Sequence, residues 1–190
     1  MTSDLVPLPP MLLERFARLG VDVDELLRRA EIPRSRFGVE KPQGTTSELF
    51  ALWHAAGELG GESLGLRAGS ETLPHHQTIA TLAALHSPTL GEGFAKLARY
   101  KRLVCPEEIT IDVRRGEARL RFEWLLADSD PPPMLMAGVF AGVVSLAQRG
   151  TRKPIRPRRI ELTRRRAHEA SLRKHFGCDD STGLPPMKGN

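Results

Sequence analysis

The chain has 190 residues, 40% hydrophobic and 27% charged, which is typical of a globular protein and excludes a disordered chain. No apolar run approaches the roughly 20 residues of a membrane-spanning helix, and the N-terminus lacks the basic and apolar regions of a secretion signal. The net charge of +5 is uneven, because residues 149–190 hold 12 Lys/Arg and 4 Asp/Glu, whereas the preceding residues have a net charge of −3.

Helical periodicity dominates the first half of the chain. Apolar residues three and four apart predict helices over residues 12–19, 22–30, 45–56, 79–85 and 89–98. Asp22, Thr45 and Thr89 are each followed three residues later by glutamate, so side chains can satisfy the free backbone N–H groups of the first turn. Pro33 and Pro88 separate successive helices.

The period changes to two after Pro106. Apolar and polar residues alternate in EITIDV and again in EARLRFEW, with Arg115 and Gly116 between them, which predicts a hairpin with one buried face. Pro131–Pro133 precede MLMAGVFAGVVSLAQRG, a helix that is apolar nearly all round. Ile160 and Leu162 predict a third strand, and a last helix ends at Gly177.

This order predicts an α+β fold. We expect a mostly helical N-terminal half followed by a small sheet that contains the β-hairpin, in the order β-β-α-β-α, covered by helices. One effector-binding and dimerisation domain would occupy residues 1–178, and residues 179–190 would be a C-terminal tail or the start of a linker.

Motifs of catalysis and metal binding are absent from the sequence. His75 and His76 are adjacent and lack the spacing of metal ligands, and nothing marks a base beside Cys105. Cys105 and Cys178 stand far apart, which argues against a disulfide framework and favours the cytoplasm. We therefore predict no enzyme activity, no cofactor and no metal.

Nucleic-acid binding has two candidate segments. DELLRRAEIPRSRF is similar to half of a helix-turn-helix, but Pro42 and Gly44 stand where a second, DNA-reading helix is needed. The basic stretch after residue 148 is either a solvated face or a segment that meets phosphates. A stand-alone protein-interaction or nucleic-acid-binding module that uses this tail therefore remains the alternative function.

Several stretches together resemble a known family. LLRRAEIP, ELFALWHAAGELGGESLGLRAG, LHSPTLGEGFAKLARYKRLV, the hairpin with its proline-started helix, and KHFGCDDSTG are similar to the N-terminal arabinose-binding-like domain of AraC-type transcription regulators. Asp179 and Asp180 depart from that pattern, which has an apolar strand there. The resemblance implies a cytoplasmic sensor in bacteria that binds an unknown small-molecule effector, forms a homodimer, and contacts DNA only through a separate C-terminal module outside this chain.

Candidate effector-binding residues lie between the hairpin and the helices, and we expect Tyr100, Arg102, Arg121 and Trp124 there. Aromatic rings bury a flat group, and an arginine pairs with a carboxylate. Arg121 and Trp124 have opposite parity on one strand, so a shared pocket would need a bulge or a sheet edge. The alternatives are a core tryptophan and an arginine on a solvated face.

The apolar helix after Pro133 is the candidate dimer interface. The proposed contact residues are Met136, Val139, Phe140 and Val143. Small residues between them, at Ala137, Gly138, Ala141 and Gly142, would allow a second helix to come close, and a two-fold interface would use the same surface twice. The alternative is a central core helix within one chain.

Overall fold

The computed structural model describes residues 4–71, 77–161 and 169–178. Its α-helices are α1 (Pro10–Arg18), α2 (Val23–Arg29), α3 (Thr46–Gly60), α4 (Leu64–Ser70), α5 (Ile79–Leu85), α6 (Leu90–Val104), α7 (Pro133–Thr151) and α8 (Glu169–Phe176). A 3-10 helix spans Arg34–Gly38. Strands β1 (Val6–Pro7) and β2 (Gln43–Gly44) form one antiparallel pair, and β3 (Glu107–Arg114) and β4 (Glu117–Trp124) form another. The α+β prediction is confirmed.

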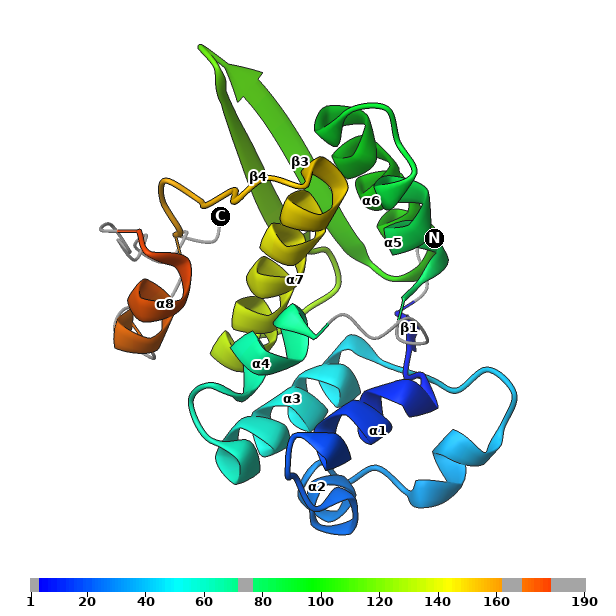
Figure 1. Ribbon diagram of the computed structural model, residues 1–190. Helices are drawn as coiled ribbons and strands as arrows, with labels where there is room; N and C mark the ends of the chain where they lie inside the picture. The colour runs from blue at the N-terminus through cyan, green and yellow to red at the C-terminus, as the bar shows by residue number, and fades with distance from the viewer. Residues whose placement is uncertain (1–3, 72–76, 162–168, 179–190) are drawn as a thin grey trace.

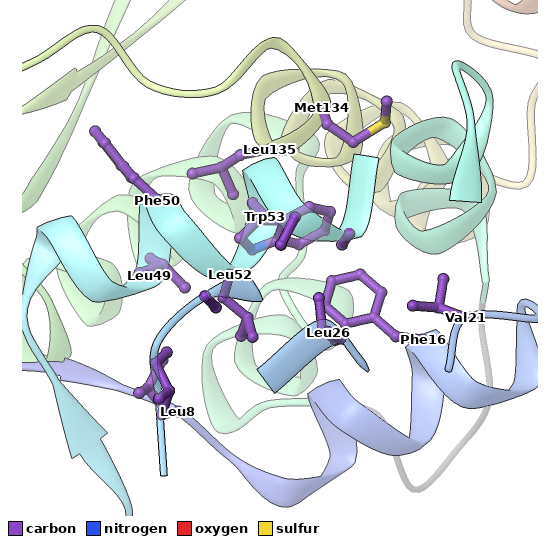
Figure 2. Close-up of a cluster of buried hydrophobic side chains, with 14 of the residues drawn as sticks. Leu8, Phe16, Val21, Leu26, Leu49, Phe50, Leu52, Trp53, Met134 and Leu135 are labelled. Atoms are coloured by element: carbon purple, nitrogen blue, oxygen red, sulfur yellow. The ribbon is translucent and has the colours of Figure 1, made fainter. Parts of the chain in front are cut away.

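Helices α1, α2 and α3 form a layer at one end of the molecule (Figure 1). The predicted caps are present: Asp22 accepts from the backbone N–H of Glu25 at 3.0 Å, and Thr45 and Glu48 form a reciprocal capping box. Beneath α3, the rings of Phe16 and Trp53 meet edge to face with centroids 5.0 Å apart. Figure 2 shows that Trp53 of α3 lies between Phe16 of α1 and the start of α7 at Met134 and Leu135.

The hairpin lies along α6 and α7, and its tip extends beyond the helices (Figure 1). Arg115 and Gly116 both have positive φ, 51° and 80°, which is the geometry of a two-residue turn that matches strand twist. Glu107 pairs with Trp124 at the base of the hairpin, where Glu107 is 0% exposed. Ile111 and Leu120 in the middle of the hairpin pack against a buried cluster, whereas Val113 near the tip is 68% exposed, so only the tip lies outside the core.

Helix α7 is the central helix of the fold, and α4 packs closely along it. A Cβ on Gly65 would lie 2.1 Å from the carbonyl oxygen of Met134, and a Cβ on Gly69 would lie 2.0 Å from that of Gly138. The backbones of the two helices therefore touch at two places one turn apart. No residue larger than glycine fits at either position without a shift of the backbone.

Of the predicted third strand, the described residues hold only a bridge residue at Arg159, and the two sheets that they form have two strands each. Ile160 is instead buried in a cluster with Leu172 and Phe176 of α8, so apolar alternation here reflects packing against helices. Leu162 lies outside the described residues, as do His75, His76 and residues 179–190. The predicted end of the last helix is confirmed, with Gly177 at a φ of 65°.

The chain that follows α2 tests the similarity to half of a helix-turn-helix. After α2, the chain enters the 3-10 helix Arg34–Gly38 and then β2, which pairs with β1. No α-helix follows α2 until Thr46, and that helix packs in the core through Leu52 and Trp53. The second reading helix is therefore missing, as the sequence predicts.

Candidate functional site

An open groove of about 650 Å³ lies between α3 and the segment that leads into α7. Its lining residues are Ser47, Phe50, Ala51, Trp53, His54, Gly57, Glu58, Ser129, Asp130, Pro131, Pro132, Pro133 and Met134. Apolar and aromatic side chains with a few polar groups are the usual lining of a small-molecule site, and the volume is in the usual range. The groove is therefore one candidate site.

The sequence positions each wall of this groove. The capping box at Thr45 fixes the start of α3, which places Phe50 and Trp53 one turn apart. Pro133 is the first residue of α7, where a missing N–H costs nothing. The Met134 side chain then turns toward α4, and its sulfur accepts the backbone N–H of Gly65 at 2.8 Å. The start of α7, which forms one wall of the groove, is therefore packed against Gly57 of α3 and Gly65 of α4.

Charged side chains lie at the rim of the groove. Glu58 pairs with the guanidinium of Arg29 at 3.2 Å and with Nδ1 of His54 at 3.4 Å. The side chains of His54 and Glu58 are both well exposed, so their pairing contributes little to stability. The exposed side chains of His54 and Glu58 are therefore free to exchange their mutual contact for hydrogen bonds to a ligand whose apolar part lies against α3.

A second candidate site is a buried polar cluster at the base of the hairpin. The Glu107 side chain is 0% exposed, and Nζ of Lys101 in α6 lies 2.5 Å from its Oε2. The Cys105 sulfur lies 3.8 Å from Lys101 Nζ and 3.9 Å from Glu107 Oε2. A buried carboxylate needs such a cation, since its desolvation is otherwise costly.

The cluster changes the acidity of two of its members. Burial alone would lower the pKa of Lys101, but the charge of Glu107 and the Cys105 sulfur raise it by more, so the pKa is raised overall. Burial raises the pKa of the Cys105 thiol, which keeps the thiol protonated near neutral pH. Cys105 is thus unsuited to act as a nucleophile, in agreement with the sequence interpretation.

Trp124 completes this cluster. Its ring meets Phe50 edge to face with centroids 5.2 Å apart, and Lys101 Nζ lies 5.8 Å from the ring centroid. Trp124 Nε1 and Glu107 Oε1 are buried, and within the described part of the chain neither has a hydrogen-bond partner. Buried polar atoms normally have hydrogen-bond partners, so two such atoms without partners in one cluster are unusual.

The predicted effector residues are dispersed over this region. Trp124 belongs to the buried cluster, whereas Arg121 lies on the exposed face of β4, as its parity requires. Arg102 is exposed and pairs with Glu108 at 3.0 Å, and Tyr100 is 37% exposed on α6. The structure therefore brings Trp124 together with Lys101, and does not place Arg121 beside them.

Sequence reasoning missed Glu107 and Lys101, although a signal was present. Glu107 has the same parity as Ile109 and Ile111, so the alternation that assigns those isoleucines to the buried face also assigns Glu107 to it. A carboxylate on that face requires a cation from a neighbouring element. Lys101, six residues earlier in the last turn of α6, supplies it.

The candidate interface residues on α7 have mixed environments. Met136 is buried, whereas Val139, Phe140 and Val143 are half-buried. Phe140 meets Phe122 of β4 edge to face, with centroids 5.7 Å apart. The small residues of α7 allow α4 of the same chain to pack closely at Gly138, so their presence does not require a second molecule.

Dimerisation through α7 stays a prediction. Val143→Arg places a charge on the half-buried face, so we expect the sedimenting mass to fall from two chains to one at micromolar concentration. Val113→Arg at the exposed hairpin tip is the control and should leave the mass unchanged. A wild-type monomer throughout the accessible concentrations would contradict the dimer, and unfolding of Val143→Arg would assign the residue to the core.

Two further features are absent from the residues that the structure describes. No group of three or more His, Cys, Asp or Glu side chains in the described ranges is arranged to hold a metal ion. No helix that the structure describes has the length and apolar character to cross a membrane.

Comparison with known proteins gives one family. Residues 20–185 match the family described as the arabinose-binding domain of AraC transcription regulator, N-terminal. No curated protein matches the chain. The match covers both candidate sites, from α2 through the hairpin to α8. The chain therefore belongs to the family of N-terminal arabinose-binding domains of AraC transcription regulators, which are regulatory domains.

Proposed function

We propose that this chain is the small-molecule-sensing regulatory domain of an AraC-type transcription regulator, and that its effector binds in the groove between α3 and the start of α7. The observation that carries the proposal is the groove itself: Phe50, Trp53 and Met134 line it, and its volume of about 650 Å³ suits a small molecule. The signal would pass to a separate C-terminal DNA-binding module.

Helix α7 supplies a physical route for that signal. Met134 and Leu135 at its start pack with the N-terminal helices, and Ala141 in its middle packs with α8. Leu146 near its end packs with the α5–α6 pair. Close-packed interfaces respond to a displacement by repacking, so a ligand that moves the start of α7 acts on all three clusters.

The chemistry of the groove limits the effector. Phe50, Trp53 and the proline segment favour a flat or apolar body. Glu58 and Asp130 add carboxylates to the lining, which disfavours an anionic group beside them and favours a hydroxyl, amide or cation. The family description names arabinose, and we do not extend that sugar to this chain.

A thermal-shift screen of small metabolites tests this function. We expect at least one neutral or cationic compound with an apolar body to raise the melting temperature, because a ligand that binds only the folded state stabilises it by mass action. At a ligand concentration of 100 times Kd the gain is about 2.7 kcal/mol. A broad screen with no saturable shift would contradict the sensor function.

A further inference from the structure

The base of the hairpin holds two complementary polar atoms that lack partners. Glu107 Oε1 is an acceptor and Trp124 Nε1–H is a donor, and both atoms are buried without a hydrogen bond to any described residue. Glu107 and Trp124 are directly opposed in the β3–β4 register, so their side chains stand on the same face of the hairpin. Leaving both unpaired costs free energy, about 1–3 kcal/mol for each group.

Neighbouring contacts hold the side chains of Glu107 and Trp124 in place. The second carboxylate oxygen of Glu107 is held by Lys101 Nζ at 2.5 Å, and the Trp124 ring is held by Phe50. The backbone N–H of Leu125 donates to the carbonyl of Pro106 at 2.8 Å, which ties the two chain segments together beside the pair. Donor and acceptor are thus fixed in place before any ligand arrives.

The chemistry of the two atoms selects the group that satisfies both. That group must donate to a carboxylate oxygen and accept from an indole N–H, which a hydroxyl or an amide does. A carboxylate cannot donate to Glu107, and an ammonium cannot accept from Trp124. The Lys101–Glu107 pair is already balanced in charge, so a further ion of either sign would be left uncompensated in a buried place.

We propose that Glu107 and Trp124 form a binding site for the hydroxyl or primary amide of a neutral small molecule. Leu125 and Leu126, which directly follow Trp124 in the chain, are exposed apolar side chains and offer a surface for the rest of such a molecule. The site is distinct from the groove, because neither Glu107 nor Trp124 lines the groove.

Indole NMR on the intact chain tests the site directly. The chain has two tryptophans, so a ¹⁵N-labelled sample gives two indole N–H resonances, and Trp53→Phe assigns them. Benzamide and benzyl alcohol are the probes, with benzoate and toluene as matched controls without the required donor. We expect the first two to shift the Trp124 resonance saturably at millimolar concentration, and the two controls to leave it unchanged.

Variants locate the interaction. Trp124→Phe keeps the ring contact with Phe50 and removes the donor, so benzamide binding measured by calorimetry should weaken about tenfold, the worth of one hydrogen bond. Trp53→Phe should bind benzamide as the wild type does, and so should Ser47→Trp, which obstructs the groove alone.

Three results would overturn the proposal. One is a Trp124 resonance that neither probe moves, which would mean that the two atoms hold water only. The second is an equal response to toluene, which would mean apolar contact without the polar pair. The third is unchanged benzamide affinity in Trp124→Phe. Each of these results leaves the groove and its effector untouched, so the two proposals fail separately.

Discussion

Replacing Gly69 with alanine is expected to lower the free energy of unfolding by about 3 kcal/mol. The new Cβ would lie 2.0 Å from the carbonyl oxygen of Gly138 and 2.8 Å from the Cβ of Ala141. Backbone cannot rotate away as a flexible side chain does, and α4 cannot shift along α7 because Gly65 makes the same contact with Met134. Urea denaturation measures the loss, provided that the transition is two-state.

Gly91→Ala is the matched control for this substitution. Gly91 lies in α6 with nothing within 4 Å of its Cβ position, so alanine should stabilise the helix by about 0.5–1 kcal/mol. Opposite signs for the two Gly→Ala changes would support the backbone contact between α4 and α7. A Gly69→Ala protein as stable as the wild type would show that the two helices are farther apart than described.

Replacing Lys101 with methionine is the second change with a large expected effect. It leaves the carboxylate of Glu107 buried without its cation, and breaking a buried pair in this way costs about 3–5 kcal/mol. The Lys101 side chain is 35% exposed, so water reaches its end of the pair, and we expect about 3 kcal/mol. Glu107→Leu added to Lys101→Met should restore most of the stability, because no charge is then left buried.

The pH dependence of stability has a definite sign for this pair. Because the pKa of Lys101 is raised in the folded state, its contribution is fully present below the ordinary lysine value of about 10.4. That contribution is lost as the pH rises through the higher folded pKa. Urea midpoints measured up to pH 11 should fall more steeply for the wild type than for the double variant. Equal slopes would contradict the ion pair.

The local features of the fold were predictable because short-range chemistry determines them. Thr45 and Thr89 each begin a helix through a side-chain bond three residues away, and the Arg115-Gly116 turn fixes the hairpin register. Alternation along β4 correctly separates exposed Arg121 from half-buried Trp124. Each of these depends on residues within one or two turns of each other.

Contacts between distant segments were not predictable in the same way. Nothing near Gly65 or Gly69 in the sequence indicates that their Cα atoms face the backbone of α7, which is about 70 residues later. The pairing of β1 with β2 rests on two residues in each strand, too few for a periodic signal. Ile160 follows the pattern of a strand and is buried against helices, since apolar alternation alone does not name the partner.

The two candidate sites also differ in how far the sequence predicts them. Trp124 was identified from its aromatic character, and the groove was not, because it forms where α3 and the proline segment meet. Prolines 131–133 indicated only the start of a helix. Their second role, as one wall of the groove, depends on the packing of Met134 against Gly57 and Gly65.

The claim that the effector binds in the groove is tested most directly by calorimetry. A compound from the thermal-shift screen is titrated into two variants, each with a serine replaced by tryptophan. Ser47 is an exposed residue of the groove, and Ser35 is an equally exposed serine away from it. If the effector binds in the groove, Ser47→Trp should weaken its affinity at least about tenfold, which is about 1.4 kcal/mol, and Ser35→Trp should leave it unchanged. Equal affinity in both variants would contradict the assignment of the groove as the effector site.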